Sequence, residues 1–316
     1  MRTLKRTMVA LLALLPFATG MALAEAGHGY SRLFVFGDSL SDPGNNFAVT
    51  GETSHPPFDP LPVASYGVGG HHYLNGRTWI EDLAEEMELT EWAKPAYRDP
   101  AFGNYAYAYA RARAFSPVAP SLSEQVQAWS QAGHCTGSAM NDTLFVLQIG
   151  GNDVGDAILA YGLGQDPMVI FGAALNSIAA NIEYLAGCGA RNFMIANVPN
   201  FGVTPFVIAQ GAEAVAGASA MSAAFNDLLQ SVVIDNLPDY LNVSVIDFFG
   251  IASTVTAMPE AFGFTDVTTP CLAFGVTKDA FCKDRDGHLF WDVLHINKRA
   301  HALIAAIVIG QLPVPD

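Results

Sequence analysis

The chain has 316 residues, of which 51% are hydrophobic and 14% are charged, and its formal net charge is −15. So large an apolar fraction can form a substantial core, which excludes disorder by composition. The excess of acidic residues excludes the basic surface that binding to nucleic acid or to anionic lipid requires.

The first residues have the pattern of a secretory signal peptide. Three basic residues precede an apolar run at residues 8–18, and residues 22–24 (ALA) form a small-x-small cleavage site. We expect cleavage after Ala24, because the run is too short to anchor the chain across a membrane. Residues 25–316 are then expected to form a single domain without a transmembrane segment, in a secreted or periplasmic protein.

Apolar strand patterns and amphipathic helix patterns alternate along the rest of the chain. The predicted strands lie at residues 33–36, 104–110, 143–149, 192–197 and 243–247, and the predicted helices at 78–89, 121–131, 166–186, 212–235 and 297–309. Ser121 and Glu124 form a capping box, and Pro167 takes a first helical position. This order predicts an α/β domain with a mostly parallel sheet covered by helices on both faces. Residues 254–290 are expected to form a long loop.

Four cysteines in an exported chain favour two disulfides over free thiols. Three pairings are possible. We favour Cys271–Cys282, because these two lie close together in a Gly-rich polar loop, and this pair leaves Cys135–Cys188. No Cys-x-x-Cys spacing occurs, so the cysteines indicate neither a metal site nor a redox motif.

Ser39 lies at the carboxyl end of the first predicted strand, within Gly37-Asp38-Ser39-Leu40. This edge of a parallel sheet is where ligands bind, because the strand ends and their loops leave a crevice there. Ser39 is therefore a candidate nucleophile. The alternative is that Gly-Asp-Ser is only a turn, since all three residues favour turns.

Asp292 precedes His295 by three residues near the carboxyl terminus. We expect this spacing to place both side chains on one side of a helical turn, where the carboxylate can hold the imidazole tautomer that accepts a proton from serine. The alternative is that Asp292 caps the following helix and that His295 is a surface residue.

Asn152 follows the clearest buried strand, in Gly150-Gly151-Asn152-Asp153. Its side-chain amide could donate a hydrogen bond to the oxyanion that forms when an ester is attacked. An Asx turn is the alternative explanation of this motif.

Taken together, these blocks resemble the GDSL, or SGNH, family of esterases and lipases over residues 32–301. FGDSLSDPGNN resembles the family's first block, GGND its third, and the Asp292–His295 segment its fifth. The resemblance implies a three-layer α/β/α, flavodoxin-like sheet of about five strands without metal or cofactor, and a bacterial-type secreted member acting on acyl esters. It also implies that Ser39 is the nucleophile and gives its own N–H to the oxyanion hole, with Asn152 as a second donor.

The second block departs from the family pattern. Family members usually carry Asn-x-Ala-x-Gly-Gly, whereas this chain has NYAYAY at residues 104–109, with Tyr109 at the place of the second glycine. A backbone donor requires a conformation and not glycine itself, so Tyr109 can serve the oxyanion hole if its φ is compatible. Its side chain could instead narrow the acyl pocket.

The function that these residues predict is a serine ester hydrolase that cleaves a small-molecule or lipid ester through an acyl-serine intermediate. Three alternatives use the same fold: acyl transfer from a phospholipid to an alcohol, carbohydrate O-deacetylation, and a binding protein that has lost activity. The sequence leaves open the acyl chain length, the alcohol and the oligomeric state.

Overall fold

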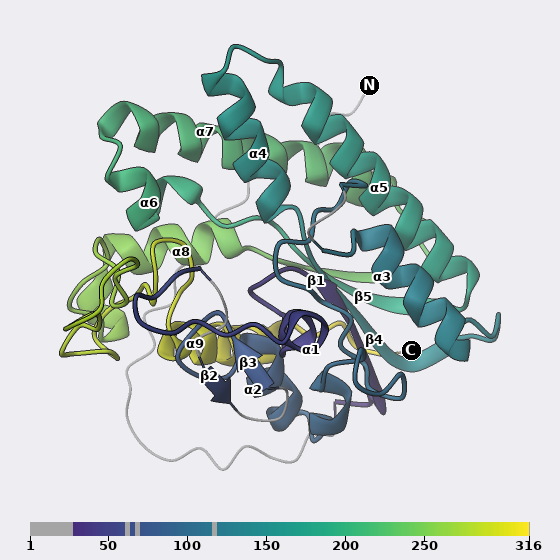
Figure 1. The fold of residues 1–316 in the computed structure, drawn as a ribbon. Helices are drawn as coiled ribbons and strands as arrows, with labels where there is room; N and C mark the ends of the chain where they lie inside the picture. Colours follow the sequence, from purple (N-terminus) through teal and green to yellow (C-terminus); the bar gives the residue numbers. More distant parts are fainter. Residues whose placement is uncertain (1–27, 61–63, 67–69, 116–118, 316) are drawn as a thin grey trace.

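The computed structural model describes residues 28–60, 64–66, 70–115 and 119–315 (Figure 1). The predicted signal peptide, residues 1–24, lies outside the described residues.

Within these ranges the main sheet has four parallel strands in the order β1-β4-β5-β6. Their bounds are β1 Arg32–Gly37, β4 Met140–Gln148, β5 Ala190–Ala196 and β6 Asn242–Ile246. Each of the first three contains a run of β-branched, aromatic and aliphatic residues, which pack well on both faces of a sheet. Gly37 pairs with Gln148, which pairs with Ala196, so the loops after β1, β4 and β5 all leave the sheet at one edge.

Alternate residues of the strands supply two separate cores, as the two-residue period of a strand requires. Phe34, Phe145 and Phe193 lie in register on one face, with ring centroids 5.5 and 5.6 Å apart between neighbours. Val35 and Val146 point to the other face. Both sets are fully buried.

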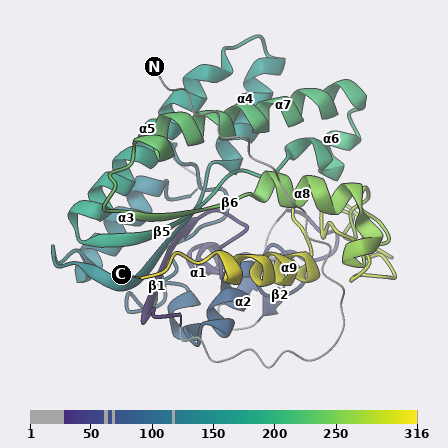
Figure 2. The ribbon, with the colours of Figure 1, turned by 180° about the vertical axis from the view of Figure 1, so that it is seen from behind.

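Helices cover both faces, which confirms the predicted three-layer architecture (Figures 1 and 2). The phenylalanine face packs against α3 Leu122–Trp129, α4 Gly151–Gly162, α5 Pro167–Gly187 and α7 Ala212–Leu228. The opposite face packs against α2 Trp79–Glu86 and α9 Lys298–Val308. The remaining elements are α1 Asn45–Thr50, α6 Pro205–Ile208, α8 Phe248–Ala257 and a hairpin of β2 Ala64–Tyr66 and β3 Gly70–His72.

Helix starts follow the predicted capping residues. Ser121 and Glu124 form the capping box of α3, and Pro167 follows the N-cap Asp166 at the start of α5. Helices α4 and α8 are not predicted from the sequence. The start of α4 contains Gly150 and Gly151, which suggest a turn, and α8 lies partly in the predicted loop 254–290.

Residues 104–110 do not form the predicted strand, so the main sheet of the described residues has four strands. Tyr105 N and Tyr107 N donate to Val35 O and Gly37 O at 2.8 and 3.1 Å, so the segment follows the free edge of β1. Its bridges are isolated because the ladder with β1 stops at Gly37, whose N–H donates to the Gln125 side chain at 2.9 Å and not to this segment. The Asn45 side-chain amide binds the carbonyls of residues 104 and 106, which face away from β1. The strand prediction is wrong here because the side chains of Gln125 and Asn45 take backbone groups that regular strand pairing would use.

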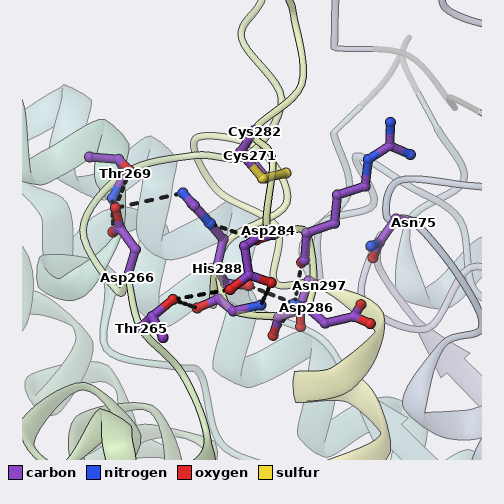
Figure 3. The surroundings of a disulfide bond; sticks show 12 residues. Asn75, Thr265, Asp266, Thr269, Cys271, Cys282, Asp284, Asp286, His288 and Asn297 are labelled. Atoms are coloured by element: carbon purple, nitrogen blue, oxygen red, sulfur yellow. Dashed lines mark hydrogen bonds and ion pairs between the residues drawn. A yellow bond between two sulfur atoms is a disulfide. The ribbon is translucent and has the colours of Figure 1, made fainter.

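The four cysteines form the two disulfides Cys135–Cys188 and Cys271–Cys282, the pairs that the sequence favours. The second lies in the loop between α8 and α9, which Figure 3 shows. Asn297, the N-cap of α9, donates its side-chain amide to the carbonyls of His288 and Arg285 at 2.6 and 3.0 Å. The disulfide before residues 292–295 and the Asn297 hydrogen bonds after them therefore hold this part of the loop in place.

One described helix, α5, is long and apolar enough to cross a membrane by length and composition. Its residues Phe171, Leu175, Ile178 and Ile182 are buried in the core against the sheet. Helix α5 therefore packs as a core helix in this fold.

We expect the two disulfides to differ in their contribution to stability. Cys135–Cys188 closes a loop of 53 residues and Cys271–Cys282 one of 11. The loss of loop-closure entropy in the unfolded chain predicts that the double serine variants lower the free energy of unfolding by about 4 and about 3 kcal/mol respectively. Urea unfolding monitored by circular dichroism measures both. A larger loss for the 271–282 pair would contradict this ranking.

Candidate active site

The turn after β1 holds Ser39 in a fixed position. Gly37 allows the close approach of β1 to β4, since a Cβ there would lie 2.7 Å from Gln148 O. Asp38 accepts hydrogen bonds from Leu40 N at 3.1 Å and from the Gln148 side-chain amide at 3.0 Å. Hydrogen bonds therefore hold the residues on either side of Ser39, and Ser39 itself remains partly exposed at the end of the strand.

Ser39, His295 and Asp292 form one hydrogen-bonded chain. His295 Nε2 lies 2.9 Å from Ser39 Oγ, and His295 Nδ1 lies 2.7 Å from Asp292 Oδ2. A carboxylate oxygen accepts hydrogen bonds, so the contact with Asp292 favours the tautomer with the proton on Nδ1, which leaves Nε2 free to accept the Ser39 proton. The fold thus brings together three residues from two segments, in which Ser39 and His295 are 256 positions apart.

The Asp292–His295 segment is not the predicted helical turn. It is an irregular bend in which Asp292 Oδ1 accepts from the backbone N–H groups of Leu294 and His295 at 2.8 and 2.7 Å. The three-residue spacing works because the Asp292 side chain folds over its own backbone, as in an Asx turn. The helix α9 begins later and is capped by Asn297.

Two charged neighbours control the protonation of His295. Burial disfavours the imidazolium, but the Asp292 carboxylate, its hydrogen bond and the charge of Asp38 outweigh burial and raise the pKa of His295 above its usual value. Asp38 is itself buried, and this burial raises its pKa to about 6. Nearby His301 is buried without a carboxylate partner, and its pKa falls to about 3.

Asn152 lies in the first turn of α4, directly after β4. Its Nδ2 donates to Ala110 O at 2.9 Å, and an amide nitrogen carries a second hydrogen that can serve a ligand. Asn152, Ser39 and His295 line one pocket of about 80 Å³. The remaining lining residues are Asp38, Leu40, Gln148, Gly151, Pro199, Phe201, Thr204 and Leu294.

Tyr109 has φ +66°, a conformation that glycine favours and that few other residues adopt. Arg111 Nη1 donates to Tyr109 O at 2.7 Å, which holds the peptide that follows Tyr109. Ala108 N, in the peptide between residues 107 and 108, donates to Asp42 at 2.9 Å. The side chain lies outside the lining of the pocket. Its ring packs edge-on against Tyr73, which in turn lies 5.5 Å from the His295 ring.

Sequence reasoning missed the residues that support Tyr109 and Asn152. Arg111 forms a bidentate pair with Asp156 at 2.9 and 2.8 Å, and Arg113 bonds both Asp156 and the buried Asp153. These pairs tie the segment after Tyr109 to α4. The signal in the sequence was the alternation of Arg111 and Arg113, which suits two arginines directed to one acidic helix face.

Within the described ranges, no group of three or more His, Cys, Asp or Glu side chains is placed to hold a metal ion. The arrangement provides a serine hydroxyl, a base in contact with it, a carboxylate that orients the base and an amide donor in the same pocket. Together these groups can perform nucleophilic attack on an acyl carbon.

The comparisons with known proteins agree with this geometry. The family model described as GDSL-like Lipase/Acylhydrolase matches residues 33–308. A GDSL esterase/lipase of Arabidopsis thaliana is 24% identical over 86% of this chain and 85% of its own length, and a second one is 24% identical over 93% and 91%. The thermolabile hemolysin of Vibrio parahaemolyticus is 23% identical over 87% of this chain and 62% of its own length.

The pKa of His295 should depend on its carboxylate partner. We expect the wild-type value to lie above the ordinary 6.5, and Asp292→Asn to lower it, because burial then acts with less opposition. A ¹⁵N NMR titration of the imidazole nitrogens measures the change. Asp166→Asn, which keeps an N-cap on distant α5, is the control. An unchanged pKa in Asp292→Asn would contradict the assigned pairing.

Proposed function

The chain belongs to the GDSL-like lipase/acylhydrolase family and is a hydrolase of ester substrates, and we propose that it is an exported serine esterase that works through an acyl-serine intermediate. The observation that carries the proposal is the hydrogen-bonded chain from Ser39 through His295 to Asp292 at 2.9 and 2.7 Å. Export is supported by two disulfides, which persist in oxidising compartments.

In the first half of the proposed reaction, His295 Nε2 takes the proton of Ser39 as Oγ attacks the ester carbonyl. The imidazolium that forms faces the Asp292 carboxylate. It then gives the proton to the leaving alcohol, and the acyl group remains on Ser39. In the second half, water attacks the acyl-serine with His295 again as the base, and the acid product leaves.

The carbonyl oxygen becomes negative in each half, and we propose that three N–H groups receive it: Ser39 N, Asn152 Nδ2 and Tyr109 N. A donor of this kind is worth about 3 to 4 kcal/mol in serine hydrolases. The hydrogen bond from Asn152 to Ala110 O supports this role, because it orients the amide before substrate binds.

Replacing Ser39 tests the proposal directly. We expect Ser39→Ala to lower kcat/KM for p-nitrophenyl acetate by about 10⁴-fold or more, because the nucleophile is lost and only binding and oxyanion contacts remain. The thermal unfolding midpoint should stay within a few degrees. Ser231→Ala, which changes an exposed serine, is the matched control.

A second measurement identifies the covalent step. A fluorophosphonate should add one phosphonyl group to the peptide that contains Ser39, and mass spectrometry should find none in Ser39→Ala. Turnover that survives in Ser39→Ala at the wild-type rate would disprove the proposed nucleophile.

The conformation of Tyr109 provides a test of the third donor. Glycine adopts a positive φ without cost, whereas a β-branched residue is strongly disfavoured there. Both Tyr109→Gly and Tyr109→Val remove the ring, so their difference reports the backbone. We expect kcat for acetyl esters to be about tenfold lower in Tyr109→Val than in Tyr109→Gly, as a cost of 1–2 kcal/mol implies. Equal values in two folded variants would exclude a role for this backbone position.

A further inference from the structure

A large apolar groove opens beside the candidate active site. It has a volume of about 790 Å³, and its lining comes mainly from α4, α6 and α7. These three helices lie near one another in Figure 1. Most of its lining is apolar, with Ile158, Leu159, Phe206 and Met221 as the larger side chains. This volume is within the usual range for sites that bind small organic molecules.

Small residues on two helices leave this space open. Gly155 and Gly162 of α4 and Gly217 of α7 line the groove. A Cβ built on Gly162 or Gly217 would meet no atom within 4 Å, and one on Gly155 would meet only Phe201 at 4.0 Å. The glycines are therefore not required by close helix packing, and larger side chains could fill the groove without moving the backbone.

The groove is continuous with the pocket that contains Ser39. Gly151, Asn152, Phe201 and Leu294 line both. We propose that the groove binds the aliphatic acyl chain of the substrate, an inference that rests on the proposed function. The enzyme is then selective for medium-length and long acyl esters.

The position of the proposed catalytic groups assigns the acyl part, and not the alcohol, to this groove. The oxyanion lies at Asn152, which lines the groove, whereas His295, which must protonate the leaving alcohol, does not line it. An acyl chain attached to a carbonyl at Ser39 therefore extends past Asn152 along α4. The alcohol leaves on the side of His295.

The charges in the groove favour an uncharged occupant. Of its three charged lining residues, Arg111 and Asp156 are bonded to each other at 2.8 and 2.9 Å, so neither is available to an ionic ligand, and Glu213 is exposed to solvent. Leu159, Tyr161 and Phe206 are 62%, 65% and 48% exposed and line the same groove, so they form a contiguous apolar patch of the kind that marks ligand-binding grooves. An alkyl chain would cover these three side chains and would itself bring no polar group that needs a hydrogen-bond partner.

The length of the groove sets the expected chain length. Its α4 lining runs from Asn152 to Gly162, which is about 15 Å at the helical rise per residue. An extended chain advances about 1.2 Å per bond, so this length holds about twelve carbons. A second apolar pocket, which Leu294 also lines, has a volume of only about 70 Å³, too small for such a chain.

The test compares p-nitrophenyl esters from acetate to laurate, below their micelle concentrations, in the wild type and in Gly155→Leu and Gly217→Leu. We expect each variant to lower the ratio of kcat/KM for laurate to that for acetate by about tenfold, because leucine occupies the space of several methylenes. Gly172→Leu, the same change in α5 outside the groove, should keep the wild-type ratio.

The outcomes separate this inference from the proposed function. Hydrolysis of acetate that does not need Ser39 would overturn the proposed function. Hydrolysis that needs Ser39, with wild-type ratios in both folded groove variants, would overturn the acyl groove alone. A loss seen with dodecyl acetate but not with p-nitrophenyl laurate would assign the groove to the alcohol and would also overturn the inference.

Discussion

The buried carboxylate of Asp42 holds the two parts of the site that the chain must bring together. It accepts hydrogen bonds from Gly44 N, Asn45 N and Asn46 N, at the start of α1 just after Ser39, and from Ala108 N, at 2.6 to 3.2 Å. Burial raises its pKa even though four donors oppose this change. Each buried N–H left without an acceptor would cost about 1–3 kcal/mol, so the nucleophile loop and the Tyr109 segment depend on the same group.

Contacts between residues far apart in the sequence also decide which parts of the fold could be predicted from the sequence. The strands around Phe34, Phe145 and Phe193 are local apolar runs, and the helix starts at Ser121 and Pro167 follow capping rules, so both were predictable. The geometry of residues 104–110 was not, because it depends on the side chains of Gln125, which binds Gly37 N, and of Asn45, about 60 positions away from this segment. Strand propensity indicates that a segment is extended but not what its carbonyls bind.

In the candidate site, too, some features could be predicted from the sequence and others could not. Residue types and spacing indicated Ser39, Asn152, Asp292 and His295, since the proposed chemistry needs a hydroxyl, an amide, a carboxylate and an imidazole. The positive φ of Tyr109 could not be seen in a tyrosine, because the hydrogen bonds around it, from Ala108 N to Asp42 and from Arg111 to Tyr109 O, form only in the folded chain. The groove could not be seen either, because α4 was not predicted and its glycines indicate a turn as readily as an open surface.

The proposed reaction separates charge in a direction that the fold already favours. The imidazolium forms at His295, where the carboxylates of Asp292 and Asp38 raise its pKa, and the oxyanion forms at Asn152, in the first turn of α4. The positive end of the α4 dipole lies at that turn and favours negative charge. Because these dipoles are fixed by burial and hydrogen bonding before substrate binds, they need no reorganisation as the charges develop. The same helix continues along the groove, so one element both favours the oxyanion and provides the wall on which the acyl chain is proposed to lie.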